Sequence, residues 1–195
     1  MGINKAVFLD RDGVITEDPP HYAHRLDQLR IIPGSAQAIQ LLNAHHFRVI
    51  VISNQSGVAR GYYSEDDVKI FNDGIEFLLK KVGAHIDTIY YCPHHPEAFV
   101  ERYKINCDCR KPKPGMILEA AQKHSLDIEK SFVVGDKWSD IEAGRAAGCK
   151  TVLVLTGHGK EEVDKKQGSA DYIALDLYDA VDKYILSTGN YLEDD

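Results

Sequence analysis

Short runs of apolar residues alternate along this chain with longer stretches in which apolar residues recur every three or four positions. The short runs predict buried strands at Lys5 to Asp10, Arg48 to Ile52, Ile86 to Tyr91, Ser131 to Gly135, Thr151 to Leu155 and, as an edge strand, Tyr172 to Ala174. The periodic stretches predict helices at Ser35 to His46, Ser64 to Val82, Pro114 to His124, a stretch ending at Ala147, and Leu177 to Ser187. Strands that alternate with helices in this way form a parallel sheet.

The second strand is apolar on both faces, which is typical of a sheet covered by helices on both sides. The predicted fold class is therefore α/β, with three αβα layers around a parallel sheet. Ser35 and Ser64 are the expected N-caps of the first two helices. No repeat, linker or large insertion interrupts the pattern, so residues 1–195 should form one domain without a large cap domain. A polar loop at residues 16–24 either lines a pocket or is an ordinary surface loop.

The charge balance restricts the partners of the protein. The chain has 23 basic and 30 acidic residues, a formal net charge of −7. This argues against a general nucleic-acid binder, so an anionic substrate has to be bound by local cations. Neither a membrane-spanning stretch nor a signal-peptide pattern is visible. We expect a cytoplasmic, monomeric protein that binds a small molecule.

Polar side chains follow three of the predicted strands. Asp10 and Asp12 follow the first, Ser53 ends the second and Asp136 ends the fourth. The carboxyl ends of parallel strands form the ligand-binding edge of open α/β sheets. Residues two apart in an extended chain share a face, so both aspartates can bind one divalent cation or divide nucleophile and acid/base roles. Taken alone, the first segment also fits a plain turn rich in aspartate and glycine.

Two further segments offer groups that bind phosphate. The segment Ser53 to Gly61 consists of small and polar residues, whose hydroxyl and backbone N–H groups can bind an anion, although such loops are common. Arg110 offers a planar guanidinium for a phosphate or sugar oxygens, and Lys111 an ammonium that neutralises developing charge. The alternative is a basic turn in solvent, which suits Lys113 better than Lys111.

Three of the four cysteines lie near a histidine pair, and this clustering indicates a metal site rather than disulfides in a cytosolic chain. Four such ligands fit tetrahedral zinc in a closed, structural site. The expected ligands are Cys92, His94, Cys107 and Cys109. His95 is an alternative to His94, and reduced cysteines in an ordinary loop are the alternative to a metal. The remaining Cys149 is expected to be a small buried apolar residue.

Three motifs resemble those of the haloacid dehalogenase-like phosphatases: Phe-Leu-Asp-Arg-Asp-Gly-Val from Phe8, Asn-Gln-Ser-Gly-Val-Ala-Arg-Gly from Asn54, and Cys-Arg-Lys-Pro-Lys-Pro-Gly-Met from Cys109. Within that group they are similar to the D-glycero-D-manno-heptose 1,7-bisphosphate 7-phosphatases, and the resemblance extends from Ala6 to Gly157. It implies a Rossmann-like sheet, Mg²⁺ as cofactor and Zn²⁺ in the loop at residues 92–109. It also implies removal of the 7-phosphate from a heptose bisphosphate, for the synthesis of ADP-heptose and lipopolysaccharide.

The resemblance also implies roles for individual residues. Asp10 would be the nucleophile and Asp12 the general acid and base, while Ser53 and Lys111 would bind the phosphoryl group. Mg²⁺ would be held by Asp10, the Asp12 carbonyl and Asp136. Asp140 is expected to support these ligands, and an ordinary acidic residue in the first turn of a helix is the alternative. The expected substrate contacts are Arg11, Asp12, Asp18, Tyr22, Ser53, Asn54, Gln55, Ser56, Arg60, Arg110, Lys111 and Lys137.

Other functions fit part of the sequence. Histidinol-phosphate phosphatases share the aspartates and the zinc loop, and differ in the loops after Ser53 and Lys111. A phosphoacceptor receiver domain also uses an aspartate, a hydroxyl residue and a lysine, but needs neither an aspartate at position 12 nor a zinc loop. A zinc-stabilised binding module would not need the complete set of catalytic residue types. Two departures from the resembled pattern are Val14, where threonine is frequent, and the loop at residues 19–22.

Overall fold

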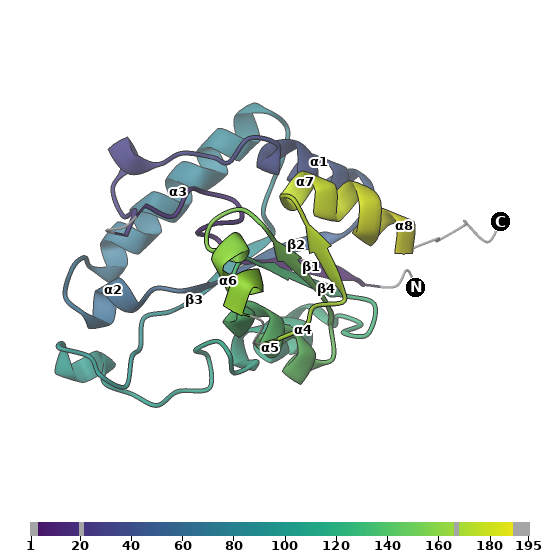
Figure 1. Ribbon diagram of the computed structural model, residues 1–195. Coiled ribbons are helices and arrows are strands. Elements are labelled where there is room, and N and C mark those ends of the chain that lie inside the picture. Colours follow the sequence, from purple (N-terminus) through teal and green to yellow (C-terminus); the bar gives the residue numbers. More distant parts are fainter. Residues whose placement is uncertain (1–3, 20–21, 166–167, 189–195) are drawn as a thin grey trace.

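The computed structural model describes residues 4–19, 22–165 and 168–188. Six parallel strands form one sheet in the order β3-β2-β1-β4-β5-β6 (Figure 1). They are β1 (Ala6–Leu9), β2 (Arg48–Asn54), β3 (Thr88–Cys92), β4 (Phe132–Gly135), β5 (Lys150–Val154) and β6 (Tyr172–Ala174). In the register, Phe8 of β1 lies between Ile50 of β2 and Val133 of β4. The strand order reverses between β1 and β4, and ligands of open α/β sheets bind at the carboxyl ends next to such a reversal.

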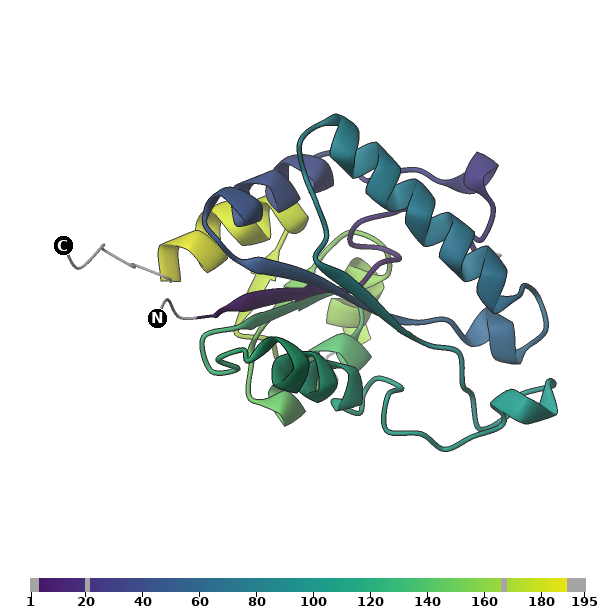
Figure 2. The same cartoon turned by 180° about the vertical axis from the view of Figure 1, so that it is seen from behind.

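Helices cover both faces of the sheet, which gives the three predicted layers (Figure 2). One face carries α1 (Ser35–Ala44), α3 (Glu65–Lys81) and α7 (Leu177–Ala180), which continues into a π-helical turn (Val181–Ile185) and α8 (Leu186–Thr188). The other face carries α4 (Gly115–His124) and α5 (Trp138–Ala147). Val7 and Leu9 pack into the first layer and Ala6 and Phe8 into the second, because side chains alternate along a strand.

Of the two predicted N-caps, Ser64 is confirmed and Ser35 is wrong. Ser64 caps α3: its side chain accepts a hydrogen bond from the backbone N–H of Asp67 in a capping box. Ser35 does not cap α1, because Gly34 occupies the N-cap position with φ 87°. The Ser35 hydroxyl is buried and donates instead to the carbonyl oxygen of Val14 at 2.8 Å. The serine therefore ties the helix to the segment after β1.

Element ends shift from the predicted positions by up to two residues. α1 ends at Ala44 rather than His46, which adopts a left-handed conformation with φ 58°. The third strand runs from Thr88 to Cys92 rather than from Ile86 to Tyr91, and β2 extends to Asn54. These extensions carry the ends of β2 and β3 further toward the carboxyl edge of the sheet.

Four short elements have no counterpart in the periodic pattern: α2 (Ser56–Ala59), α6 (Gly159–Lys165) and the 3₁₀ turns η1 (Leu26–Gln28) and η2 (Glu101–Tyr103). Within the described ranges, the connections around the carboxyl edge contain loops and these short elements, and no large cap domain, as predicted. Pro20 and His21 of the expected loop lie outside the described residues. No helix in the described part of the chain is long and apolar enough to span a membrane.

Candidate active site

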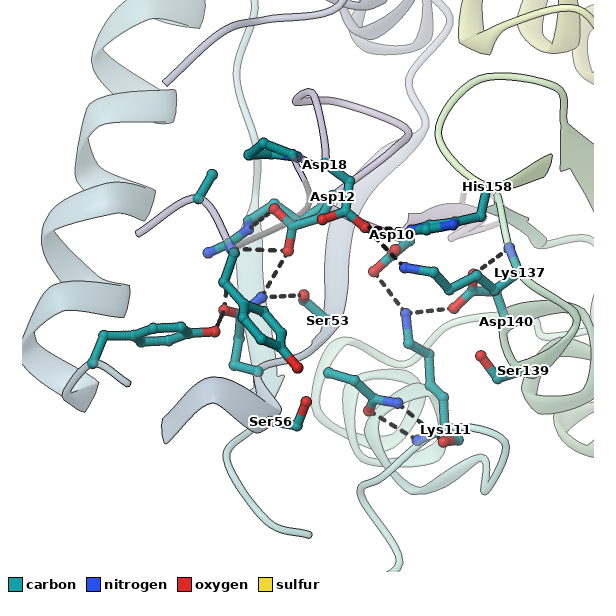
Figure 3. Close-up of a pocket in the computed structure, with 17 residues that line it drawn as sticks. Asp10, Asp12, Asp18, Ser53, Ser56, Lys111, Lys137, Ser139, Asp140 and His158 are labelled. Carbon is teal, nitrogen blue, oxygen red and sulfur yellow. Dashed lines mark hydrogen bonds and ion pairs between the residues drawn. The ribbon is translucent and has the colours of Figure 1, made fainter. Parts of the chain in front are cut away.

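The carboxyl ends of the three central strands meet around one cavity of about 470 Å³ (Figure 3). Asp10 directly follows β1, Ser53 lies near the end of β2, and Asp136 directly follows β4. The Asp10 N–H donates to the carbonyl oxygen of Val134 at 2.9 Å, which fixes the aspartate to the neighbouring strand. The predicted site residues that line the cavity are Asp10, Arg11, Asp12, Asp18, Tyr22, Ser53, Asn54, Gln55, Ser56, Lys111 and Lys137.

Lys111 holds the Asp10 carboxylate in the cavity (Figure 3). Its Nζ donates to Asp10 Oδ1 and to the Ile52 carbonyl oxygen, both at 2.7 Å, and lies 2.6 Å from Asp140 Oδ1. Burial raises the pKa of Asp10 to about 6, against the opposing effect of the Lys111 charge. Burial also acts to lower the pKa of Lys111, but the two carboxylates outweigh it and raise that pKa overall. The lysine is therefore a fixed cation beside Asp10.

The Asp12 carboxylate is held by three neighbours. Arg11 Nε donates to Oδ1 at 2.9 Å and a terminal guanidinium nitrogen donates to Oδ2 at 2.8 Å. Thr16 Oγ1 donates to Oδ1 at 3.2 Å, and Gln55 Nε2 donates to Oδ2 at 2.9 Å. The Asp12 side chain is still 17% exposed, so it is fixed in orientation while it remains accessible from the cavity.

The side chains of the adjacent residues Ser53 and Asn54 form different contacts. Ser53 Oγ accepts a hydrogen bond from Gln55 Nε2 at 2.8 Å, which leaves its own proton free to donate into the cavity. Asn54 forms two hydrogen bonds with the backbone of Lys111: Nδ2 donates to the carbonyl oxygen at 3.0 Å, and Oδ1 accepts from the N–H at 3.1 Å. Asn54 thereby fixes the chain that carries the lysine.

Three carboxylates beside the cavity offer oxygen atoms that all lie within 4.8 Å of one another: Asp10, Asp136 and Asp140, here called the carboxylate cluster. Asp136 Oδ2 accepts from the His158 N–H at 2.8 Å, while Oδ1 is buried and has no hydrogen-bond partner among the described residues. Burial, with the nearby Asp10 charge, raises the pKa of Asp136 to about 8. Hard oxygen ligands and a partnerless oxygen fit a Mg²⁺ ion.

The cluster contains Asp140 and not the side chain of Asp12. Asp140 is paired with Lys111, and it also accepts from the Lys137 N–H at 3.0 Å in the first turn of α5. Two glycines make room for Asp136: a Cβ at Gly13 (φ 90°) or Gly157 (φ 55°) would lie 2.3 Å from its Oδ2. The sequence Asp-Arg-Asp-Gly therefore needs its glycine for close approach of the two strand ends.

A charged network forms the rim of the cavity. Lys137 Nζ donates to Asp18 Oδ2 at 3.0 Å, and His158 Nε2 lies 3.2 Å from the same oxygen. Burial acts to lower the pKa of Lys137, but the charges of Asp136, Asp10 and Asp18 outweigh it and raise that pKa. The rim thus presents a second fixed cation. Aromatic rings add to the cavity wall: Tyr22 and Tyr63 both line it, and their ring centroids lie 6.1 Å apart.

Three arginines predicted as substrate contacts are placed differently. The Arg11 guanidinium is buried and bonded to Asp12, Gln55 and Asn72, so its side chain supports other residues. Arg60 and Arg110 are absent from the residues that line the cavity. Arg110 donates to the His94 carbonyl oxygen at 3.2 Å and borders a separate hollow of about 220 Å³.

The four predicted zinc ligands come together in the structure as one group, here called the thiol cluster: Cys92, His94, Cys107 and Cys109. The Cys107 and Cys109 sulfurs are 3.2 Å apart, and Cys92 lies 3.5 Å from Cys107. His94 Nδ1 lies 3.5 Å from Cys109 Sγ and 3.8 Å from Cys92 Sγ. Ligands of a tetrahedral zinc ion lie about 3.5–3.8 Å apart. Three of the four distances lie in this range, the Cys107–Cys109 distance is shorter, and the donor set fits Zn²⁺.

Of the two adjacent histidines, His94 belongs to the thiol cluster. His95 lies outside the thiol cluster, and its Nδ1 accepts from the Glu97 N–H at 3.1 Å. The loop is also tied to α3, because the hydroxyls of Tyr91 and Tyr103 donate to the two carboxylate oxygens of Glu65 at 2.8 and 2.7 Å. Cys149 is buried in the core, as predicted, and burial raises its pKa to about 12.

The structure adds four residues to the predicted site: Thr16, Tyr63, Gly157 and His158. Gly157 and His158 follow β5. Because ligands of open α/β sheets bind at the carboxyl ends of the strands, the sequence could have indicated these two residues as well. Thr16 bonds to Asp12, and Tyr63 lines the cavity and bonds to Gln55. No local pattern in the sequence distinguishes these two from other polar residues.

Known proteins resemble this chain over most of its length. A family model described as HAD-hydrolase-like matches residues 108–180. A protein of Pasteurella multocida named D-glycero-beta-D-manno-heptose-1,7-bisphosphate 7-phosphatase is 46% identical, over 91% of this chain and 95% of the relative. The protein of the same name from Escherichia coli K12 is 40% identical, over 89% of this chain and 90% of the relative.

Solved structures match as well. The crystal structure of D,D-heptose 1,7-bisphosphate phosphatase from B. bronchiseptica, complexed with magnesium and phosphate, has a TM-score of 0.86 at 32% identity, covering 94% of this chain and 99% of that one. The corresponding protein of Burkholderia thailandensis has a TM-score of 0.69 at 28% identity, covering 95% and 98%. These alignments include nearly the whole chain.

Proposed function

The chain belongs to the D-glycero-D-manno-heptose 1,7-bisphosphate 7-phosphatase family of haloacid dehalogenase-like hydrolases, and from this we propose that it removes the 7-phosphate of such a heptose bisphosphate. The observation that carries the proposal is the meeting of Asp10, Lys111 and Ser53 in one cavity beside the partnerless oxygen of Asp136. Although the protein is acidic, the fixed cations Lys111 and Lys137 both line the cavity in which an anionic substrate would bind.

The proposed hydrolysis has two steps. In the first, an Asp10 oxygen bonds to phosphorus while the bond between phosphorus and the sugar oxygen breaks, and Asp12 gives its proton to that leaving oxygen. In the second, Asp12 takes a proton from water, whose oxygen bonds to phosphorus and releases Asp10 and inorganic phosphate. Lys111 and Ser53 hold the phosphoryl oxygens in both steps, and Lys111 neutralises charge as it develops.

Two metal ions complete the proposal. Asp10, Asp136 and the Asp12 carbonyl would hold Mg²⁺, while Asp140 holds Lys111. Bound Mg²⁺ would neutralise charge on the phosphoryl oxygens. The thiol cluster would hold Zn²⁺ and so fix the loop at residues 92–109, which leads directly into Lys111.

The substrate would extend from the phosphoryl site toward the rim. We assign sugar contacts to Asp18, Tyr22 and Ser56, and the second phosphate to Arg110, with Lys137 near the transferred group. Arg60 would contact the substrate only from outside the described cavity. A monomeric state, a cytoplasmic location and a role in ADP-heptose synthesis are predictions that go with this assignment.

Phosphate release tests the proposal directly. The protein would be assayed with both anomers of D-glycero-D-manno-heptose 1,7-bisphosphate and with histidinol phosphate, with and without Mg²⁺. We expect a large preference for one heptose anomer and loss of turnover on chelation. A preference for histidinol phosphate would support the phosphatase mechanism and contradict the proposed heptose bisphosphate substrate. No turnover of any of the three would overturn the proposal.

A further inference from the structure

The side-chain amide of Gln55 has no hydrogen-bonding capacity left for a substrate. Its Oε1 accepts from the Tyr63 hydroxyl at 2.9 Å and from Arg11 at 3.1 Å. Its Nε2 donates to Asp12 Oδ2 at 2.9 Å and to Ser53 Oγ at 2.8 Å. An amide has two acceptor positions on oxygen and two N–H groups, so all four are used within the protein.

The neighbours also fix which way the amide points. Arginine can only donate, and the Tyr63 hydroxyl donates to the same amide oxygen. A flipped amide would set its N–H groups against the Arg11 guanidinium, and that contact would become repulsive. The fixed charge of Arg11 therefore requires the observed orientation, and Tyr63 reinforces it with a second donor to Oε1.

Tyr63 is held firmly enough to act in this way. It is 8% exposed, its ring stacks on His24 at a centroid distance of 5.0 Å, and it packs against Gly57, where a Cβ would lie 2.1 Å from the ring. Burial raises the pKa of Tyr63, so the hydroxyl stays protonated and donates to Gln55. The ring also lines the cavity, which excludes water from one side of the amide.

We propose that Tyr63 and Gln55 are positioning residues that aim the Asp12 carboxyl for proton transfer to the leaving group. Tyr63 fixes the amide of Gln55, and that amide fixes one oxygen of Asp12 and keeps the Ser53 proton directed into the cavity. This inference rests on the proposed phosphatase mechanism, in which Asp12 protonates the sugar oxygen as its bond to phosphorus breaks. It assigns Gln55 to the support of Asp12 and Ser53 instead of to the substrate.

The leaving group provides a readout that separates positioning from general damage. An alkyl phosphate needs a proton on its leaving oxygen, whereas p-nitrophenyl phosphate expels a stable anion that needs none. If the Asp12 carboxyl is misplaced, hydrolysis of the heptose bisphosphate should therefore slow more than hydrolysis of the aryl ester. A fault in folding, metal binding or Ser53 lowers both rates and cancels in the ratio of the two kcat/KM values. These values report the steps up to departure of the leaving group and exclude the later hydrolysis, which is the same for both substrates.

The experiment measures that ratio for wild type and four variants with Mg²⁺ present. Asp12→Asn is the reference, and its ratio should fall by about 100-fold or more, the range of general acid catalysis. Tyr63→Phe should lower the ratio by about tenfold, the scale of one hydrogen bond. Gln55→Met should lower it further, because both contacts of the amide to Asp12 and Arg11 are lost. The matched control Tyr90→Phe removes a buried hydroxyl that has no partner, and should leave the ratio unchanged.

Each result has a distinct meaning. A fall in the ratio for Asp12→Asn, Gln55→Met and Tyr63→Phe, in that order of size, supports the inference. A fall for Asp12→Asn with unchanged ratios for Tyr63→Phe and Gln55→Met would overturn it and leave the phosphatase mechanism intact. An unchanged ratio for Asp12→Asn itself would overturn the role given to Asp12, and the inference with it.

Discussion

The carboxylate cluster and the thiol cluster differ in what holds their side chains in place. Asp10 and Asp136 are fixed by neighbouring strands, and Lys111 already supplies a buried positive charge between Asp10 and Asp140. The thiol cluster joins the end of β3 to a loop that contains only the short turn η2. The first group borders a cavity, whereas the second consists of four mutually close ligands.

This difference suggests separate roles for the two proposed ions. The sheet holds the carboxylates in place without a metal, so a Mg²⁺ ion there would be free to exchange and to serve the chemistry. The loop contains little regular structure, and Ala98 and Tyr103 pack it against α2 and α3. Four zinc–ligand bonds would add to these contacts and fix its shape. Loss of Mg²⁺ should stop turnover without unfolding, while loss of Zn²⁺ should first disturb the loop.

The largest expected effect comes from Asp10→Asn, which keeps the shape of the side chain and removes the nucleophile. Phosphate release should fall by at least about 10⁴-fold, as for other hydrolases that lose their nucleophile. Circular dichroism should show an unchanged fold, because the strands and not this carboxylate hold the site. Turnover near the wild-type level would show that another group attacks phosphorus.

Asp136→Asn separates metal binding from stability. Activity should fall by more than about 100-fold, beyond the usual cost of losing a group in the outer shell of a metal site. Without metal, however, the melting temperature should rise by about 2–4 °C for each kcal/mol gained, because a buried carboxylate with a partnerless oxygen is removed. Thermal melts with and without Mg²⁺ check both parts. A variant that Mg²⁺ stabilises as strongly as wild type would contradict the assignment of Asp136 as a ligand.

Cys107→Ser tests the second cluster. The protein should lose its zinc, melt several degrees lower and keep about a tenth of its activity, since the loop precedes Lys111 and does not touch the phosphoryl site. Metal analysis, melting and phosphate release are the measurements. Cys149→Ala is the control, because it removes a buried thiol outside the cluster and should leave zinc content unchanged. Equal zinc content in Cys107→Ser and wild type would refute the site.

The smallest expected effect comes from Glu65→Gln, which weakens the tie between α3 and the loop. Hydrogen bonds from Tyr103 and Tyr91, together with nearby positive charge, lower the pKa of Glu65 although burial opposes them. An acid with a lowered pKa in the folded state stabilises the protein above its unfolded pKa, and this stability is lost as the pH falls through the folded pKa. The variant should therefore melt about 1–3 °C lower at neutral pH and no lower at acid pH. The exposed Glu76→Gln on the same helix should show no such difference.

The sequence predicted the parts of the molecule that follow from chain direction and residue type. Alternating apolar runs predicted the layers, and strand ends predicted that Asp10, Ser53 and Asp136 meet. Ligand chemistry predicted the members of the thiol cluster. What it did not predict depends on contacts between distant segments: Ser35 bonds to Val14 instead of capping its helix, and Arg11 is buried against Asn72.

The support of Asp12 illustrates the same limit. Thr16 and Gln55 reach it from two different loops, and Tyr63 acts one hydrogen bond further away. No spacing in the sequence links these residues. Arg60 and Arg110 show a different limit: their motifs predict substrate contacts, their side chains are not among the residues that line the cavity, and the contacts stay predictions.

In the proposed mechanism Asp10 carries the phosphoryl group between the two steps. This intermediate can be trapped if the enzyme is quenched during turnover, reduced with borohydride and analysed by peptide mass spectrometry. An aspartyl-phosphate is reduced to homoserine, so we expect homoserine at position 10 in wild type and none in Asp10→Asn. Homoserine at another aspartate, or at none during active turnover, would contradict it.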